Sequence, residues 1–402
     1  MAYIDGRLVH DADSHLMEMT DCLDPYLSDK LRSRLHQLPA YQYKHKMLNN
    51  EIYGVEKFRQ LHDDPTFRAD IDSTIMSRKN YEGHGAFIAA DRPHALDLLG
   101  VASQLVFTTF CLENFDLNQS DDMELCYATA SAHNHMITDF CKVDQRLLPV
   151  GYTPLEDFGR SRVAAQEAIA LGAKALMVPS TCPQHHSPSH IGLFPIWEMA
   201  QEAGIPIIFH VGGEDKINPT YLKNGLPPVP DFHGGDDNFT AVSYMTIPNA
   251  VMQTLTTLIF DGIFDRFPKL KFGAIELGAA WLPGWMRSMD SAAHAFLRNE
   301  ERLQNLSAKP SEIARRQLRV TPYPHEDTGW IVQNSGSEMC MFSSDYPHIE
   351  GGRNPLKRFD TALQNCSTIE KDNYFSGNFI DFMGAGLAPE LRNPRIVKKT
   401  AS

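Results

Sequence analysis

Apolar runs separated by amphipathic segments recur from residue 91 to residue 383. The runs lack alternating polarity, which is typical of strands buried on both faces of a parallel sheet. A segment with helical spacing of its apolar residues follows each run, and several of these end at glycine or proline. The expected strands are 7–11, 103–110, 146–155, 173–180, 205–213, 270–278, 318–323 and 339–348.

The expected helices complete the repeat. They are 91–100, 121–143, 161–171, 194–203, 244–267 with a break at Pro248, 282–298, 327–334, 355–364 and a pair within 368–383. Eight strands, each followed by a helix, predict an α/β fold of the (β/α)8 TIM-barrel type. A doubly wound open sheet is the rival, but no G-x-G-x-x-G follows the first strand.

Two segments do not fit the repeat. Residues 21–90 are polar and irregular, apart from a helix expected at 27–38 that begins at Ser28. We interpret 21–90 as a helical or irregular insertion that caps the barrel after strand one. Nothing in the pattern divides the chain, so residues 1–390 are expected to form one barrel domain. The chain after Leu387 is expected to be extended, with 391–402 as a tail that could wrap a neighbouring subunit.

Polar residues directly follow several apolar runs, which is where a barrel of this type carries its active site. The first stretch, RLVHDADSHLME, contains Asp13 and His15, and alternation along a strand would point Asp11 to the same side. His210 follows IPIIF, Glu276 follows LKFGAI and Asp345 follows MCMFSS. Taken singly, each could be a cap, a core histidine or a turn residue. Together they predict one shared cation, because burying such groups without partners costs several kcal/mol.

Composition excludes some classes of partner. The chain has 402 residues and a net charge of -13 without a basic cluster, which argues against nucleic acid and anionic membranes. Seven cysteines without a CxxC pair favour reduced thiols and a cytoplasmic location. No apolar run approaches the length of a membrane span. The expected partners are a small-molecule substrate and other subunits, in a homo- or hetero-oligomer.

The stretches DADSH, IIFHVGG, FDRFPKLKFGAIELGAAWLPGWMRSMD and FSSDYPH resemble the amidohydrolase-related branch of the amidohydrolase superfamily. The resemblance extends from residue 7 to about residue 383 and is weakest across 21–90. It implies a metal-dependent hydrolase or a non-oxidative decarboxylase. Residue by residue, it makes Asp13 and His15 the metal ligands of strand one, His210 that of strand five and Asp345 that of strand eight.

Two positions depart from the pattern of that branch. The strand-six position, commonly a histidine there, is Glu276, so an imidazole acid or base is absent from it. The binuclear hydrolases carry a carboxylated lysine at the end of strand four, where this chain has Ser180. Lys174 lies at the opposite end of that strand. A lysine-bridged metal pair is therefore not expected.

The expected chemistry uses one divalent metal, with zinc favoured and manganese or iron as alternatives. The metal would activate water for hydrolysis or clamp a small carboxylate-bearing substrate for decarboxylation. Asp345 would be the general base in hydrolysis, and Glu276 and His348 complete the candidate catalytic set. The sequence does not separate hydrolysis from decarboxylation.

Two other functions remain open at this stage. If Glu18, Glu276 and His348 also bind metal, a second metal fits, and a dinuclear iron or manganese centre could activate dioxygen. Alternatively Glu18 opens the next helix and His348 only supports Asp345 through a hydrogen bond. A third interpretation is that this chain is a partner subunit whose metal has a structural role, while a related chain performs the chemistry.

Overall fold

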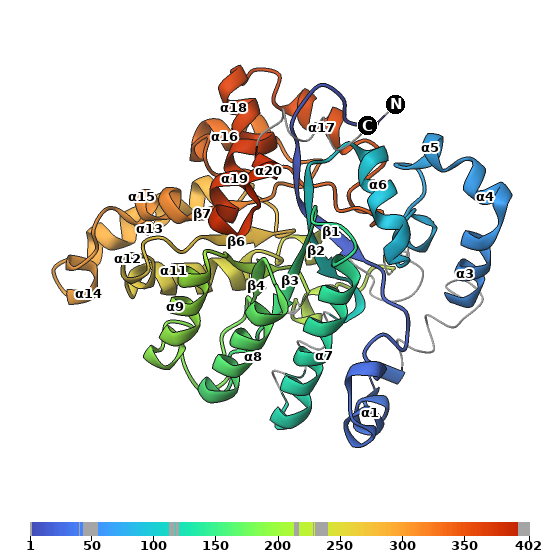
Figure 1. Ribbon diagram of the computed structural model, residues 1–402. Helices are drawn as coiled ribbons and strands as arrows, with labels where there is room; N and C mark the ends of the chain where they lie inside the picture. Colours follow the sequence, from blue (N-terminus) through green and yellow to red (C-terminus); the bar gives the residue numbers. More distant parts are fainter. Residues whose placement is uncertain are drawn as a thin grey trace.

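Seven parallel strands form one curled sheet, and their order in space follows their order in the sequence. The structure is a computed structural model that describes residues 2–39, 41–42, 55–111, 117, 120–212, 217–227, 229 and 240–392. The strands are β1 (His10–Leu16), β2 (Ser103–Thr108), β3 (Leu147–Tyr152), β4 (Ala175–Met177), β5 (Ile207–His210), β6 (Phe272–Ile275) and β7 (Leu318–Val320). Figure 1 shows helices packed around the outside of this sheet. The predicted parallel α/β architecture is confirmed.

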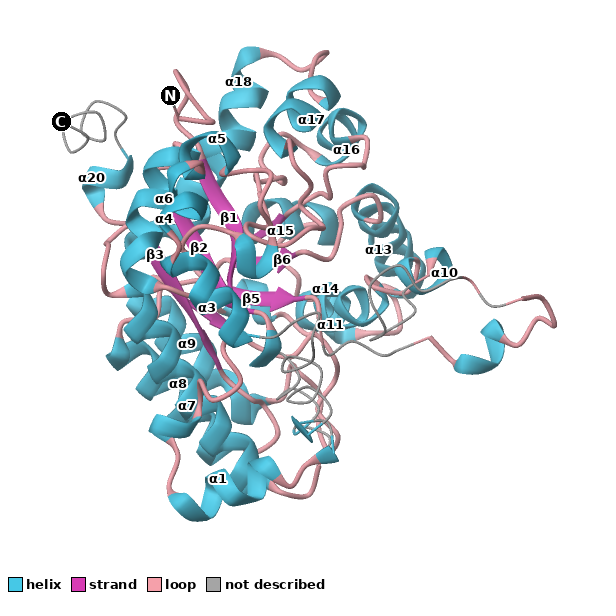
Figure 2. Ribbon diagram, turned by 90° about the vertical axis from the view of Figure 1, so that its right-hand side faces the viewer, coloured by secondary structure: helices cyan, strands magenta, loops and turns pink. Residues whose placement is uncertain are grey.

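Helices connect consecutive strands, and α7, α8 and α9 lie side by side in Figures 1 and 2. The longer ones are α1 (Asp29–His36), α3 (Val55–Asp63), α6 (Arg92–Leu99), α7 (Met123–Cys141), α8 (Phe158–Leu171), α9 (Phe194–Ala203), α11 (Asn249–Phe260), α13 (Leu282–Phe296), α15 (Pro310–Gln317), α16 (Thr328–Ser335) and α17 (Pro355–Ala362). The shorter ones are α4 (Pro65–Ala69), α5 (Ile71–Thr74), α10 (Ala241–Tyr244), α12 (Ile263–Arg266), α14 (Glu301–Gln304), α18 (Thr368–Asp372), α19 (Asn378–Met383) and α20 (Pro389–Arg392).

Several predicted helix boundaries are confirmed by local geometry. The Ser28 side chain accepts a hydrogen bond from the backbone N–H of Leu31 and so caps α1. Helix α6 ends at Gly100, which has a φ of 78°, a left-handed conformation that glycine adopts without strain. The predicted break at Pro248 is also present, because α11 begins at the next residue.

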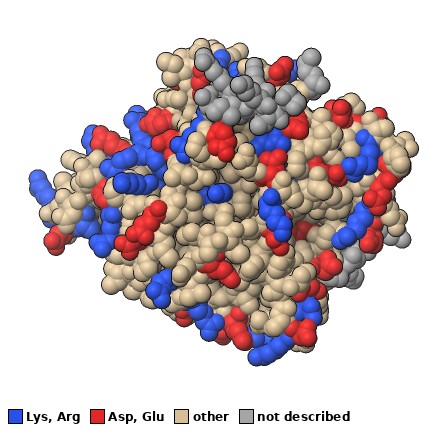
Figure 3. Space-filling model, viewed as in Figure 1, with Lys and Arg blue, Asp and Glu red and all other residues tan. Residues whose placement is uncertain are grey.

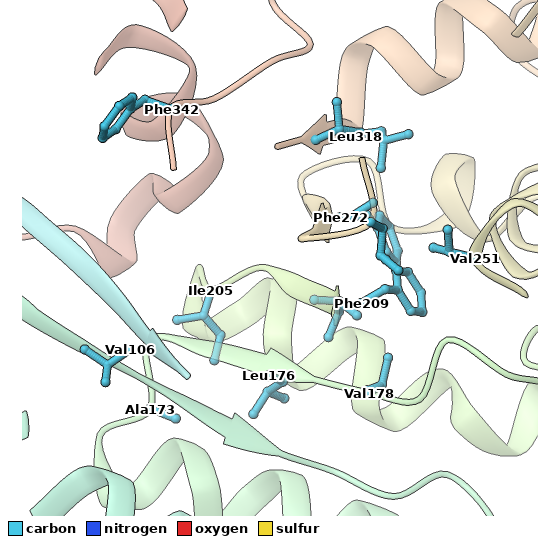
Figure 4. Close-up of a cluster of buried hydrophobic side chains, with 14 of the residues drawn as sticks. Val106, Ala173, Leu176, Val178, Ile205, Phe209, Val251, Phe272, Leu318 and Phe342 are labelled. Atoms are coloured by element: carbon cyan, nitrogen blue, oxygen red, sulfur yellow. The ribbon is translucent and has the colours of Figure 1, made fainter. Parts of the chain in front are cut away.

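The strands are buried on both faces, as the unbroken apolar runs predicted. Along β2, Leu105 and Phe107 contribute to an inner hydrophobic cluster, whereas Val106 faces the cluster beneath the helices. In β5, Ile208 faces inward and Phe209 faces outward. Figure 4 shows part of the outer cluster. This two-sided burial explains why the strand sequences show no polar face.

Helix α19 fills the inner cluster at the end of the sheet where the strands begin. Phe379, Phe382 and Met383 are fully buried there. The Phe379 ring stacks on His10, the first residue of β1, with 5.0 Å between ring centroids. Gly273 in β6 provides the space, because a Cβ atom there would lie 2.7 Å from the Phe382 ring. This end of the sheet is therefore closed by side chains.

The first strand differs from its prediction. A strand was expected at residues 7–11, but β1 extends from His10 to Leu16 and so includes Asp13 and His15. The polar residues at its centre masked its length in the sequence. The pairing of β1 with β2 also shifts between Asp11 and Ser14, so Asp11 does not share the side of Asp13 and His15, although Asp13 and His15 do converge as expected.

The eighth predicted strand is present only as isolated bridges. Residues 339–346 make one parallel bridge to β7 and one to β1, which joins the two edges of the sheet. Asp345 N–H donates to the Asp13 carbonyl at 2.9 Å, and Met341 N–H donates to the Val320 carbonyl at 2.9 Å. Asp345 has a φ of 52°, which interrupts the extended backbone that a regular strand requires.

Residues 24–91 contain α1, α3, α4 and α5 together with short 3-10 turns. The last part of this segment contacts the end of β1. Met17 N–H donates to the Ala86 carbonyl at 2.9 Å, and the Tyr81 hydroxyl donates to the Glu18 carbonyl at 2.6 Å. At the other end of the chain, α20 replaces the extended conformation expected after Leu387. The remainder of the predicted tail, 393–402, lies outside the described residues.

Acidic and basic side chains are interspersed over the face in Figure 3, and no basic patch is visible on it. Among the described residues, the helices are all too short or too polar to cross a membrane.

Asp11 should be important for stability, because its buried carboxylate joins β1 to residues 339–346. The carboxylate accepts hydrogen bonds from the Ser344 N–H, the Ser344 hydroxyl and the Gln104 amide at 2.8, 2.5 and 2.8 Å. Asp11→Ala leaves these donors without partners and should lower the free energy of unfolding by about 2–3 kcal/mol. Urea unfolding measures this change. Asp121→Ala, at an exposed aspartate, is the control, and equal stability of the two variants would contradict this role.

Candidate metal centre

Five of the predicted site residues come together where the strands end. Asp13 and His15 lie in β1, His210 is the last residue of β5 and Glu276 directly follows β6. Asp345 lies in the segment that joins β7 to β1. Lys174 directly precedes β4, at the opposite end of the sheet, as expected.

The distances place the five side chains around one point. The His15 Nε2 atom lies 3.2 Å from Asp13 Oδ1, 3.5 Å from Asp345 Oδ1 and 3.7 Å from Glu276 Oε2. The His210 Nε2 atom lies 3.4 Å from both Asp13 Oδ1 and Glu276 Oε2. One ligand atom from each of Asp13, His15, His210 and Glu276 lies within 4.8 Å of the others. Such a set of oxygen and nitrogen atoms fits a divalent cation.

Backbone carbonyls fix the orientation of both imidazoles. The His15 Nδ1 atom lies 2.8 Å from the Thr108 carbonyl, and the His210 Nδ1 atom lies 2.9 Å from the Val211 carbonyl. Because a carbonyl only accepts, each Nδ1 carries a proton, so Nε2 is the ring nitrogen that faces the centre and would bind a cation after losing its own proton. The His15 Nε2 atom is buried and has no hydrogen bond among the described residues. A cation at the centre would provide its partner.

The carboxylates at the centre are held in an environment that favours a cation. Burial raises the pKa of Glu276 to about 8, and the nearby Asp345 contributes to this rise. Burial, together with Asp13, raises the pKa of Asp345 well above its usual value. Burial alone would also raise the pKa of Asp13, but the neighbouring imidazoles of His15 and His210 hold it below its usual value. Three carboxyl groups in one buried site repel each other when ionised, unless a positive charge is bound.

Two of the acidic residues have unusual backbone conformations. Glu276 and Asp345 have φ angles of 53° and 52°, in the left-handed region that residues with a Cβ rarely adopt. The surrounding structure holds this conformation: the Glu276 N–H donates to the Thr321 hydroxyl at 2.8 Å, and its carbonyl accepts from the Tyr323 hydroxyl at 2.6 Å. Such strain concentrates at functional sites, because it directs side chains that ordinary strand geometry would turn elsewhere.

His348 lies against Asp345. Its Nε2 atom is 2.8 Å from the Thr109 hydroxyl, and that hydroxyl donates its proton to the Leu16 carbonyl. His348 Nε2 must therefore donate, which leaves a lone pair on Nδ1, 2.9 Å from Asp345 Oδ1. Two lone pairs at this distance require a proton on Asp345 or a cation between them. The atoms of His15, Glu276, Asp345 and His348 also form a second group within 4.8 Å, which overlaps the first.

Glu18 is not brought into either group. Its carboxylate accepts hydrogen bonds from the backbone N–H groups of Thr109 and Phe110 at 3.0 and 2.9 Å, and from the Thr108 hydroxyl. Glu18 follows β1 by two residues, and its side chain turns toward the end of β2. These contacts direct the Glu18 carboxylate away from both groups, and its assignment as a metal ligand stays a prediction that they do not support. Its carboxylate instead holds the chain that follows β2.

Lys79 is a residue near the site that the sequence did not identify. Its amine is buried without a hydrogen bond among the described residues, and burial lowers its pKa to about 8 despite the nearby Asp345 and Glu350. A lysine in an irregular segment carries no signal of such a position. A small pocket adjoins the centre and is lined by Asp13, Glu276, Thr321, Pro322, Tyr323, Pro324, Ser343, Asp345, Glu350 and Gly351.

The profile of the amidohydrolase family matches residues 45–381. The chain belongs to this family. No curated protein matches the chain. A solved amidohydrolase from Mycobacterium avium subsp. paratuberculosis is 20% identical, with a TM-score of 0.69, and the alignment covers 95% of this chain and 100% of that one. The predicted resemblance to the superfamily is confirmed.

Two further solved structures are similar in fold. One is 5-carboxyvanillate decarboxylase from Sphingomonas paucimobilis, with 16% identity, a TM-score of 0.62 and coverage of 94% of this chain and 99% of that one. The other is 5-carboxyvanillate decarboxylase from Novosphingobium aromaticivorans, complexed with manganese and 4-hydroxy-3-methoxy-5-nitrobenzoic acid. It has 18% identity, a TM-score of 0.62 and coverage of 94% and 96%.

Removal of a central ligand should abolish tight cation binding. Asp13→Ala and His210→Ala are each expected to weaken manganese or zinc binding at this centre by more than about 100-fold. Isothermal titration calorimetry measures the affinity. His185→Ala, at an exposed histidine after β4, should bind like the unaltered protein. Full affinity in either ligand variant would exclude that residue from the centre.

Cation binding at this centre should release protons. Because burial raises the pKa of Glu276 to about 8, this carboxyl is protonated at pH 7 until a cation displaces the proton. The affinity should therefore increase with pH up to about 8. Calorimetry in two buffers of different ionisation enthalpy counts the released protons. Glu276→Gln should release fewer, and an unchanged count would show that Glu276 does not take part.

Proposed function

We propose that this chain is a divalent-metal-dependent enzyme that decarboxylates a small carboxylate-bearing substrate without an oxidant. The observation that carries the proposal is the convergence of Asp13, His15, His210, Glu276 and Asp345 on one point at the end of the strands. The reaction class is supported by two of the three solved neighbours described above, because both are 5-carboxyvanillate decarboxylases.

Asp13, His15 and His210 would hold the cation, with Asp345 or Glu276 as a further ligand. A bound divalent cation would attract the substrate carboxylate and an adjacent oxygen and would neutralise the acidic cluster. Besides the carboxylates of the centre, the residues that line the pocket are Glu350 and the uncharged Thr321, Pro322, Tyr323, Pro324, Ser343 and Gly351, so a substrate anion finds no cationic side chain among them. Zinc and manganese both fit two imidazoles with carboxylates, and the solved neighbour with a bound metal contains manganese.

Decarboxylation needs an acid more than a base, and Asp345 fits that role. The bond between the substrate carbon and its carboxylate breaks, carbon dioxide leaves, and the electron pair remains on the carbon. Asp345 would supply the proton to that carbon and recover one from solvent. The lone pair of His348 Nδ1, 2.9 Å from Asp345 Oδ1, supports a protonated Asp345 when no cation lies between them. Hydrolysis would instead require Asp345 as an ionised base.

The fold would serve this chemistry in two ways. We propose that residues 339–346 act as the eighth strand of a closed (β/α)8 barrel within a single domain, 1–390. We also propose that residues 21–90 form a cap at the mouth of this barrel. The hydrogen bond from the Asn80 N–H to the Pro347 carbonyl, at 2.7 Å, supports this role because Pro347 directly precedes His348.

A dinuclear centre is the second candidate. The overlapping group of His15, Glu276, Asp345 and His348 would accommodate another cation beside the first. With iron or manganese, such a pair could activate dioxygen. Anomalous diffraction from crystals grown with manganese distinguishes the two candidates, because a mononuclear centre gives one peak among these side chains and a dinuclear centre gives two.

Manganese-loaded protein should release carbon dioxide from at least one member of a panel of hydroxylated benzoates and other small carboxylates. A chelator should abolish the release. Asp345→Asn, which retains the shape of the side chain but not its acid, should lower kcat by about 100-fold to 10,000-fold. A coupled bicarbonate assay measures the rate.

Asp121→Asn, at an exposed position, is the matched control and should retain full activity. Hydrolysis of lactones or amides without release of carbon dioxide would replace decarboxylation with the hydrolase reaction. Turnover that survives complete metal removal would overturn both.

A further inference from the structure

A second group of imidazole and carboxylate side chains lies within residues 55–94, apart from the centre described above. His62 lies in α3, His84 follows a 3-10 turn at Asn80–Glu82, and Asp91 ends another at Ala89–Asp91. One ligand atom from each lies within 4.8 Å of the others. The two histidines are 1% and 4% exposed. We propose that His62, His84 and Asp91 bind a divalent cation of the zinc type, which has a structural role.

His62 presents an unpaired lone pair to this group. Its Nε2 atom lies 2.7 Å from the Tyr81 carbonyl, which can only accept, so the proton of the neutral ring is on Nε2. The Nδ1 atom is therefore a bare acceptor. It is buried and has no hydrogen bond among the residues that the structure describes. A protein carbonyl that orients a histidine through its other nitrogen is the usual support of a metal ligand.

His84 is arranged in the same manner. Its Nδ1 atom is buried without a hydrogen bond in the described part of the chain, and its Nε2 atom lies 3.0 Å from His94 Nδ1. A cation on His84 Nδ1 would keep the proton on Nε2, which then donates to His94. The other tautomer would leave an N–H 3.9 Å from the Asp91 carboxylate, beyond hydrogen-bond distance. Burial lowers the pKa of both imidazoles, that of His84 to about 4. A second proton on each ring therefore does not provide the missing partner of Nδ1.

Arg68 already contacts one member of the group. Its guanidinium donates to both oxygens of Asp91, at 2.8 and 3.0 Å, and to the His62 carbonyl at 3.1 Å. These bonds hold the carboxylate in place but do not reach either imidazole Nδ1. Two imidazoles, one carboxylate and a water molecule make a tetrahedral set suited to zinc. Arg68 would then act as the partner that orients the carboxylate ligand.

The proposed cation would hold residues 55–94 against the barrel mouth. The His84 carbonyl accepts from the Tyr346 hydroxyl at 2.8 Å, and Tyr346 directly follows Asp345. Arg92, next to Asp91, donates to the His15 carbonyl at 3.2 Å. The group therefore joins α3 to residues 84–92, which contact His15 of the catalytic centre and Tyr346 beside it. This role does not depend on which reaction the centre performs.

The test uses the full chain crystallised with zinc and measured at the zinc absorption edge. An anomalous peak is expected about 2.0–2.1 Å from both the His62 and His84 Nδ1 atoms. No peak at this group, in crystals that show one among Asp13, His15 and His210, would overturn the proposal. A missing peak at the catalytic centre alone would affect only the proposed function.

Variants provide an independent measurement by equilibrium dialysis against zinc. His62→Gln with His84→Gln should lose one tightly bound equivalent and retain the one at the catalytic centre, which also reports a folded barrel. Asp13→Ala with His210→Ala should show the reverse loss. His185→Gln is the matched control and should lose nothing. If the first double variant binds as many equivalents as the unaltered protein, the proposal is wrong. If that variant does not fold, Asp91→Asn replaces it, with a zinc affinity lowered at least 10-fold expected and an unchanged affinity overturning the proposal.

Discussion

The fold places acidic and imidazole groups together in a largely buried position, where water can solvate them only in part. Asp13, Asp345 and Glu276 would repel each other as anions, and His15 Nε2 has no hydrogen bond in the described structure. The pocket beside them offers no compensating positive charge, because the residues that line it are acidic or uncharged. A positive charge at the centre relieves this repulsion, either as protons or as a cation. The hydrogen bonds from His15 Nδ1 and His210 Nδ1 to backbone carbonyls turn both Nε2 atoms toward this centre.

Position along β1 decides what each acidic residue does. Asp11 and Asp13 are two residues apart, but the shift in pairing between them sends their carboxylates to different partners. Asp11 is saturated by Ser344 and Gln104 and serves the structure. Asp13 faces the two imidazoles and serves the centre. Identical side chains in one strand therefore take separate roles through one backbone irregularity.

The sequence predicted the features that depend on local pattern. Buried strands such as β5 appear as continuous apolar runs, and glycine ends helices such as α6, so the order of elements could be deduced. The candidate site residues His210, Glu276 and Asp345 could be selected because a polar residue directly after a buried run is unusual.

Features that depend on distant partners could not be deduced. β1 was predicted too short because its polar residues find hydrogen bonds hundreds of residues away. Glu18 was assigned to the metal because nothing local indicates that the N–H groups of residues 109 and 110 would bind it. The group of His62, His84 and Asp91 comes from an irregular segment and is visible only once the chain is folded.

The contact of α19 with β1 can form only late in synthesis. β1 emerges first, but His10 stacks on a phenylalanine that is made more than 360 residues later, and Asp13 pairs with a segment near residue 345. The first strand therefore pairs with β2 early but lacks its contacts with α19 and with the segment near residue 345 until those residues have been synthesised. Contacts so far apart in sequence slow folding and prolong the exposure of apolar strands. The inner hydrophobic cluster is therefore complete only after α19 has packed against the first strand.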